Sequence, residues 1–283
     1  MSDRTPESGR HDKGLAGSWP RWLIAVVTLA VFFTLDHFAW LLFGLVPDGL
    51  EGTPYLAALF VLRWLPWLIV PALVAALFFG PRQAASALGL TRSPLTGLAF
   101  AAAVTLILPI VYAVASPVGV AEEPAEPVLR YALFPGVFEE ILYRGFLFGF
   151  LFRFARWGFL PAALVGALVF GAAHFSAGGD LNEALTIFAI TAIGGFWFAW
   201  LYAEWDFNLW IPISLHVLMN AWWELFVIAD NAAGTQATII ARFAVIGLSI
   251  LLTLALARWR GPRRIRGRDW LYRPGLGTDA PQA

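Results

Sequence analysis

The chain has 283 residues, of which 59% are hydrophobic and only 13% are charged, and it contains no cysteine. Soluble domains carry about 25% charged residues, so this composition excludes an ordinary soluble domain. The lack of cysteine excludes disulfides, thiolate metal sites, a cysteine nucleophile and lipid attachment through cysteine. The formal net charge is zero at pH 7, but the basic residues are distributed unevenly along the chain.

Apolar stretches recur along the chain, and most reach the roughly 20 helical residues that cross about 30 Å of hydrocarbon. We therefore predict an all-α polytopic membrane bundle of about eight transmembrane helices. The fourth is interrupted by charged residues, and the fifth is short. The predicted spans are residues 22–46, 55–79, 94–118, 131–152, 159–175, 182–202, 209–228 and 238–257.

The two ends of the chain are polar and differ from the bundle. Residues 1–20 contain Gly, Ser, Arg and Asp, and we expect a disordered cytoplasmic tail there. A membrane bundle then covers residues 21–258, and a basic cytoplasmic tail covers residues 259–283. A secretory signal peptide is not expected, because the first apolar stretch is too long for the apolar core of one.

The distribution of basic residues predicts the orientation of the bundle. Four Lys and Arg residues precede the first predicted span, two follow the second, two follow the fourth and seven follow the eighth. The alternate loops are acidic, and Arg130 is their only basic residue. Cytoplasmic loops of membrane proteins are enriched in Lys and Arg. The pattern predicts a multi-pass protein of a prokaryotic plasma membrane with both termini in the cytoplasm.

The fourth predicted span contains two acids and a base, Glu139, Glu140 and Arg144. Charged groups at membrane depth cost about 2.5–3.5 kcal/mol each on insertion scales and usually mark function. Glu140 and Arg144 are four residues apart, so they share a helix face and can pair. Glu139 points about 100° away, which leaves it available to face a water as a general base.

The fifth span ends in the sequence Phe170-Gly-Ala-Ala-His174. The small residues at positions 171–173 allow close approach of a neighbouring helix. We expect this approach to place His174 in a helix junction rather than against lipid.

The seventh span contains His216 and Asn220, whose spacing places the imidazole and the amide on one helix face. Glu224 continues this stripe by one further turn. An amide that donates hydrogen bonds and hardly titrates is suited to stabilising an oxyanion. The alternative is interhelical hydrogen bonding without a catalytic role.

Further polar residues in the first two spans are Asp36, His37 and Arg63. We favour an Asp36–Arg63 ion pair between the spans, although Asp36 and His37 could also belong to a shared polar cavity. The zinc-protease motif HExxH, the hydrolase motif GxSxG and a glycine-rich phosphate loop are absent from the sequence. Nucleic-acid binding is not expected.

Taken in order, Glu139-Glu140-x-x-x-Arg144, Phe170-x-x-x-His174 and His216-x-x-x-Asn220 resemble the motifs of the CPBP family. This family comprises the type II CAAX prenyl endopeptidases and the bacteriocin-processing and immunity proteins, also called Abi proteins. The resemblance covers about residues 129–225. It implies a catalytic core within a membrane helical bundle, endopeptidase activity and a catalytic set of Glu139, Glu140, His174, His216 and Asn220, supported by Arg144.

The expected reaction is hydrolysis of a peptide bond in a lipidated or membrane-associated peptide or protein. Glu139 would deprotonate the attacking water with help from His174, while His216 and Asn220 would stabilise the oxyanion. Glu140 would be the second acid, oriented by Arg144. An alternative is a metalloprotease in which Glu140, His174 and His216 bind zinc and Glu139 activates the metal-bound water. Of these two mechanisms, we favour the one that uses no metal ion.

Two other functional classes fit the same polar residues. Intramembrane Glu, His and Arg also occur in transporters and proton pathways, although this chain has no internal repeat. A non-catalytic immunity-type membrane protein would use the motifs only to shape its bundle. In every case the expected partners are the lipid bilayer and, for the protease, a membrane-associated substrate. The predicted topology places the polar residues in the outer half of the bundle, which conflicts with direct access for a cytoplasmic substrate.

Overall fold

The computed structural model describes residues 19–116, 119–229, 233–260 and 265–272. These residues form an all-helical bundle, and the pairing of Trp157 with Tyr272 is the one isolated β-bridge among them. Most of the predicted N-terminal tail lies outside the described residues, as do positions 261–264 and 273–283 of the predicted C-terminal tail.

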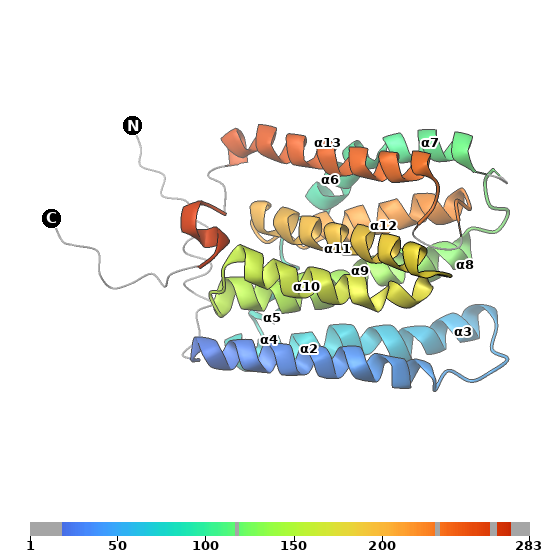
Figure 1. Ribbon diagram of the computed structural model, residues 1–283. Coiled ribbons are helices and arrows are strands. Elements are labelled where there is room, and N and C mark those ends of the chain that lie inside the picture. The colour runs from blue at the N-terminus through green and yellow to red at the C-terminus, as the bar shows by residue number, and fades with distance from the viewer. Residues whose placement is uncertain (1–18, 117–118, 230–232, 261–264, 273–283) are drawn as a thin grey trace.

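The helices follow one another in antiparallel order along a common direction (Figure 1). Several contain π-helical stretches, marked η1 to η4. The elements are α2 Arg21–Phe43, α3 Gly52–Leu59, η1 Phe60–Trp64, α4 Leu65–Phe79, α5 Ala84–Ala87, α6 Pro94–Thr105, α7 Ile107–Ala115, α8 Ala125–Pro127, η2 Val128–Leu133, α9 Phe134–Glu139, η3 Glu140–Phe148, η4 Phe150–Phe154, α10 Phe159–Ala173, the 3₁₀-helix η5 Phe175–Ala177, α11 Leu181–Glu204, α12 Trp210–Leu225, α13 Gln236–Arg260 and the 3₁₀-helix η6 Gly267–Trp270.

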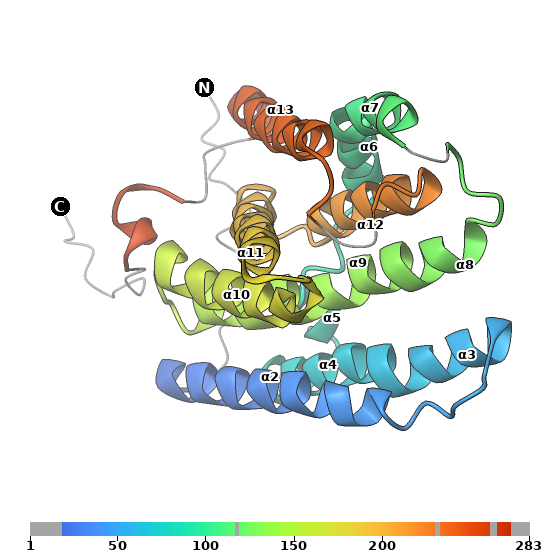
Figure 2. The same cartoon turned by 45° about the vertical axis from the view of Figure 1, so that its right-hand side comes forward.

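The helices are stacked in layers around the long helical segment 125–154 (Figures 1 and 2). Helices α2, α3 and α4 cover one side of this segment, and α10 and α11 pack beside it. Helices α12, α6, α7 and α13 cover the other side. Every residue of η3 is buried, so this segment is the centre of the bundle.

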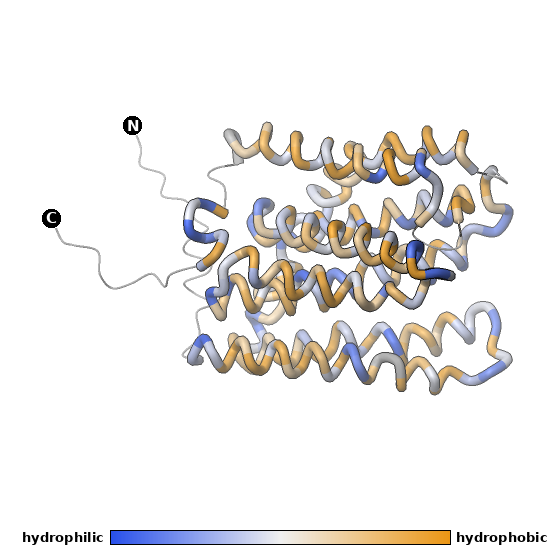
Figure 3. Tube along the Cα trace, viewed as in Figure 1, coloured by the Kyte–Doolittle hydropathy of each residue, from blue (hydrophilic) through white to orange (hydrophobic). Residues whose placement is uncertain are grey.

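The outer surface of the helices is apolar along most of their length, as expected for contact with lipid (Figure 3). Large side chains point outward from several helices, among them Trp22, Leu95 and Val114, which is 87% exposed. The chain is therefore a multi-pass membrane protein.

The prediction of eight spans is only partly confirmed. Among the described residues, five helices are long and apolar enough to cross a membrane, or six if α6 and α7 form one bent span. The segment 125–154 carries Glu139, Glu140 and Arg144 in its middle, and α12 has only 16 residues. Length and composition therefore do not show that these two segments span, although each lies within the bundle.

The predicted third span is two helices that meet at a bend of 45°. Thr105 at the end of α6 donates its hydroxyl to the carbonyl of Ala101 at 2.8 Å, a contact that tends to bend helices. Pro109 lacks the N–H that would continue the ladder into α7. These two effects explain why one apolar run becomes a bent pair.

Residues 265–272, within the predicted basic tail, pack back onto the bundle. Ile265 is buried, and its N–H donates to Glu204 Oε1 at 3.3 Å at the end of α11. Trp270 packs edge-on against Phe159 with ring centroids 5.2 Å apart. Gly158 leaves space for this segment, because a Cβ there would overlap the backbone of Leu271.

Candidate active site

Glu139 and Glu140 lie where α9 continues into the π-helical stretch η3. π-helical turns are rare and occur frequently at functional sites. Glu139 is 7% exposed and Glu140 is fully buried, so both carboxyl groups lie inside the bundle rather than against lipid. Buried acids need specific partners, because burying an uncompensated charge is costly.

Arg144 is the first partner of Glu140. Its Nη1 donates to Glu140 Oε1 at 2.9 Å, and both side chains are at most 2% exposed. The guanidinium also lies 4.6 Å from the ring centroid of Phe170 and 5.4 Å from that of Phe198. The pairing predicted from the four-residue spacing is confirmed, and the two aromatic rings hold the cation between them.

His216 on α12 is the second partner of Glu140. Its Nδ1 lies 2.8 Å from Glu140 Oε1, and because a carboxylate paired with arginine accepts hydrogen bonds, Nδ1–H is the donor. This contact joins residues 76 positions apart and orients the imidazole. The other nitrogen, Nε2, lies 4.0 Å from Glu139 Oε2.

The separation of 4.0 Å between His216 Nε2 and Glu139 Oε2 is too long for a direct hydrogen bond. A gap of this size between two polar groups suits a bridging water or a substrate oxygen. Glu139 and Glu140 therefore differ in their contacts. Glu140 is fixed by Arg144 and His216, while Glu139 faces His216 across a short gap.

Close packing of α9 against α12 brings these groups together. A Cβ on Gly136 would lie 2.5 Å from Val217 Cγ2 and 2.8 Å from Val217 N. Only glycine at this position allows the two helices to approach so closely. Glu139 follows Gly136 by about one helical turn, and His216 directly precedes Val217, so the close contact brings these two side chains toward each other.

His174 is the C-terminal cap of α10 and is half-buried. Its Nδ1 lies 2.8 Å from the carbonyl of Phe170, which can only accept, so Nδ1 carries the hydrogen and Nε2 is left as an acceptor. The expected close helix approach at this end is present, because a Cβ on Gly171 would lie 2.9 Å from the carbonyl of Phe188 on α11. In the part of the chain that the structure describes, no hydrogen bond joins His174 to Glu139.

Asn220 lies one turn beyond His216 on α12, as the spacing predicted. Its Nδ2 donates to the carbonyl of Tyr131 at 2.9 Å, which ties α12 to the π-helical stretch η2. An amide nitrogen has two hydrogens, so this contact uses one of two donors.

His174, His216 and Asn220 line one cavity of about 380 Å³ among α7, α10, α11, α12 and α13. Most of its lining residues come from the last turn of α10, the middle of α11 and the second half of α12. In Figure 1 the C-terminal ends of α10 and α12 lie at the end of the bundle away from the start of α2 and the end of α13. The remaining lining residues of the cavity are Tyr112, Tyr131, Phe170, Ala177, Ile187, Ile190, Thr191, Gly194, Trp197, Phe198, Met219, Trp223, Glu224, Ala229, Arg242 and Ile246.

The segment that builds this site is similar to a known family. Residues 122–222 match the family model described as Rce1-like, type II CAAX prenyl endopeptidase Rce1-like. These residues form an Rce1-like segment. The match confirms the family resemblance of the three motifs, which all lie within it. No curated protein and no solved structure matches the chain.

The three zinc ligands considered from the sequence, Glu140, His174 and His216, are not arranged around a common metal position in the structure. Among the described residues there is no group of three His, Asp or Glu side chains placed to hold a metal ion. Glu140 Oε1 is engaged by Arg144 and by His216 Nδ1, so Glu140 and His216 bind each other rather than a common ion. We therefore derive no step through zinc.

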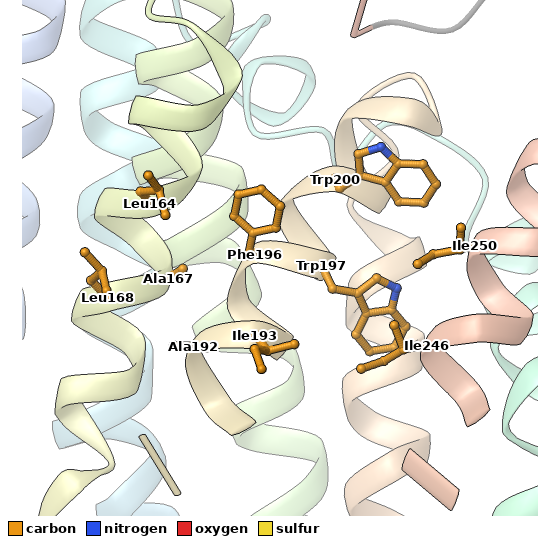
Figure 4. A pocket seen from close by; sticks show the side chains of 10 residues that line it. All are labelled: Leu164, Ala167, Leu168, Ala192, Ile193, Phe196, Trp197, Trp200, Ile246 and Ile250. Carbon is orange, nitrogen blue, oxygen red and sulfur yellow. The ribbon is translucent and has the colours of Figure 1, made fainter. Parts of the chain in front are cut away.

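An apolar groove lies on the flank of the Rce1-like segment, between α10, α11 and α13 (Figure 4). Its volume is about 520 Å³. Trp197 and Ile246 line both the groove and the polar cavity, so the two spaces share a wall. The other lining residues are Leu164, Ala167, Leu168, Ala192, Ile193, Phe196, Trp200 and Ile250.

Tyr143 is a neighbour of the site that sequence reasoning missed. Its hydroxyl donates to Asp36 Oδ1 at 3.2 Å, and its ring packs edge-on against Phe170 with centroids 5.0 Å apart. Arg63 is close enough to attract Asp36 electrostatically, whereas the predicted Asp36–Arg63 ion pair itself stays a prediction. The available signal was the four-residue spacing of Glu139 and Tyr143.

Proposed function

We propose that the chain is an intramembrane endopeptidase that hydrolyses a peptide bond of a lipidated or membrane-associated substrate. The observation that carries the proposal is the buried cluster of Glu139, Glu140 and His216 within a segment that matches a CAAX endopeptidase family. Such a cluster places an acid and an oriented imidazole on either side of a gap that suits a small polar ligand.

Glu139 is the proposed general base. It would take a proton from a water in the gap, and the resulting hydroxide would attack the carbonyl carbon of the substrate. His174 would assist, because its Nδ1 contact with Phe170 leaves Nε2 as an acceptor for a hydrogen bond from the O–H that the hydroxide keeps. Glu139 would then deliver its proton to the departing amine nitrogen as the C–N bond breaks.

His216 and Asn220 are the proposed donors to the oxyanion. When both nitrogens of His216 are protonated, Nδ1–H remains with Glu140 and Nε2–H points toward the gap. Asn220 would contribute its second amide hydrogen. A preorganised donor of this kind is worth about 3 kcal/mol of transition-state stabilisation.

Glu140 and Arg144 are proposed to position His216 rather than to touch the substrate. Their buried pair fixes one carboxylate oxygen against Nδ1, which sets the orientation of the ring. The apolar groove beside the cavity would take the lipid chain or apolar side chains of the substrate, because Trp197 and Ile246 make its wall continuous with the cavity.

The test is cleavage of prenylated and unmodified peptides by the purified chain in liposomes, followed by mass spectrometry. Wild-type protein should cleave, and Glu139→Gln should lose at least about 100-fold in kcat. Glu126→Gln, the same change at an exposed acid of the short helix α8, is the matched control and should retain activity. Wild-type turnover by folded Glu139→Gln protein would refute the assignment.

The same preparation separates the other functional classes. A transporter would move solute or protons across the liposome membrane without producing peptide fragments. A non-catalytic immunity-type protein would keep its biological effect after Glu139→Gln substitution.

A further inference from the structure

Phe170 on α10 contacts three of the groups that build the candidate active site. Its carbonyl accepts the Nδ1 hydrogen of His174 at 2.8 Å, and the two rings lie 4.7 Å apart between centroids. Its ring also lies 4.6 Å from the Arg144 guanidinium and 6.4 Å from the centroid of the His216 ring. The position of Phe170 therefore affects the position of His174 and of the cation beside Glu140.

Tyr143 on η3 packs against Phe170 inside the bundle. The two rings meet edge-on with centroids 5.0 Å apart, and Tyr143 is 2% exposed. Phe32 on α2 and Trp67 on α4 also meet the Tyr143 ring edge-on, with centroids at 5.1 Å and 6.3 Å. Edge-to-face aromatic pairs have a preferred geometry, so these neighbours leave the Tyr143 ring little freedom to turn away from Phe170.

The hydroxyl of Tyr143 is held by α2, which lies outside the Rce1-like segment. It donates to Asp36 Oδ1 at 3.2 Å. Asp36 is a half-buried acid in a helix that is long and apolar enough to cross a membrane. Acids at such positions are rare and costly, and they usually mark a function. Asp36 lies four residues after Phe32, so one face of α2 contacts both the hydroxyl and the ring of Tyr143.

We infer that Asp36 and Tyr143 are positioning residues for the proposed hydrolysis and act through Phe170 on His174. This inference rests on the proposed endopeptidase function, and it extends the site to a helix outside the Rce1-like segment. Asp36 holds the hydroxyl of Tyr143, and the Tyr143 ring holds Phe170. The carbonyl of Phe170 then keeps the His174 hydrogen on Nδ1 and leaves Nε2 as the acceptor. Phe170 and His174 line the cavity, whereas Asp36 and Tyr143 are not among its lining residues.

Three variants separate the hydrogen bond from the packing. Tyr143→Phe removes the hydroxyl and keeps the ring, Asp36→Leu removes the acceptor, and Asp36→Asn removes the charge and keeps an oxygen that accepts. Tyr143→Phe and Asp36→Leu should each lower kcat for a lipidated peptide by about 3- to 10-fold with little change in KM, as expected for loss of one hydrogen bond. Asp36→Asn should stay within about twofold of the wild type. Thr34→Val, at an exposed position of α2, is the matched control and should keep the wild-type kcat.

A spectroscopic measurement reports on His174 without turnover. The full chain labelled with ¹⁵N-histidine in neutral detergent contains four histidines, and His174→Gln assigns the signal of His174. At a pH where the imidazole is uncharged, the nitrogen shifts of the wild type should show one tautomer, with the hydrogen on Nδ1. Tyr143→Phe and Asp36→Leu should move both shifts toward a mixture of tautomers, whereas Asp36→Asn and Thr34→Val should not. The double change Tyr143→Phe with Asp36→Leu should add nothing to either single change, because both remove the same hydrogen bond.

If wild-type protein cleaves no peptide but the His174 signal responds to Tyr143→Phe and Asp36→Leu, the proposed catalytic function fails and the positioning link stands. If the wild type cleaves and folded Tyr143→Phe protein keeps the wild-type kcat and His174 signal, the positioning link is overturned while the protease stands. The link is also overturned if kcat falls only in proportion to the folded fraction with an unchanged His174 signal, or if Asp36→Asn loses as much kcat as Asp36→Leu. Tyr143→Phe keeps the aromatic packing and serves as the test if Asp36→Leu does not fold.

Discussion

Replacing Glu140 with Gln should destabilise the protein far more than the same change at Glu139. Glu140 is fully buried and accepts hydrogen bonds from Arg144 at 2.9 Å and from His216 at 2.8 Å. Neutralising it leaves the guanidinium of Arg144 buried without its counter-charge. Breaking a buried pair in this way costs about 3–5 kcal/mol, a large part of a total stability of about 5–15 kcal/mol.

The assay is unfolding in mixed micelles with increasing dodecyl sulfate, followed by tryptophan fluorescence. Glu139→Gln is the matched control, because Glu139 Oε2 lies 4.0 Å from His216 Nε2, too far for a hydrogen bond, and the cost of this change should be below about 1 kcal/mol. The double change Glu140→Gln with Arg144→Met removes both charges and should recover most of the loss. If Glu140→Gln and Glu139→Gln destabilise the protein equally, the buried pair does not stabilise the site as argued.

Three further substitutions test the packing around the site. Gly136→Ala should cost about 1–3 kcal/mol in unfolding free energy and reduce activity, because the added Cβ would collide with α12. Gly247→Ala on α13 is the control and should be neutral, because its added Cβ would have no neighbouring atom within 4 Å. His174→Gln should reduce kcat with less than about 1 kcal/mol change in stability, since its ring nitrogen Nδ1 bonds a carbonyl of its own helix; a large loss of stability would point to a structural role. Gly158→Ala should displace residues 265–272, which faster trypsin cleavage within that segment would report and unchanged cleavage would contradict.

The sequence predicted those features of the fold that depend on local composition. Every predicted apolar stretch is helical in the described residues, because an apolar run in a bilayer must satisfy its backbone internally. The bend between α6 and α7 was missed, because a hydropathy pattern does not register the effects of Thr105 and Pro109. Hydropathy does not identify segment 125–154 as a span, because it counts Glu139, Glu140 and Arg144 as exposed charges, whereas Glu140 is paired with Arg144 of the same segment and with His216 of α12.

For the site, too, the sequence predicted the local contacts but not those between distant helices. The Glu140–Arg144 pair follows from four-residue spacing on one helix, so the sequence predicted it correctly. The contact of Glu140 with His216 depends on the rotation and close approach of two helices far apart in the sequence. Gly136 allows this approach, but a single glycine in the sequence does not predict it. The catalytic roles of all five residues, Glu139, Glu140, His174, His216 and Asn220, remain predictions.

The Glu140–Arg144 pair also bears on how the protein is made. During synthesis the segment 125–154 leaves the ribosome well before α12, so His216 is not yet present to receive Glu140. Each charge at the centre of an isolated inserting helix opposes partition into lipid by about 2.5–3.5 kcal/mol. Because Arg144 lies one turn from Glu140 on the same helix, Glu140 already has its counter-charge when the segment reaches the translocon. We therefore expect loss of Arg144, which leaves Glu140 without a partner until α12 is made, to lower the yield of folded protein.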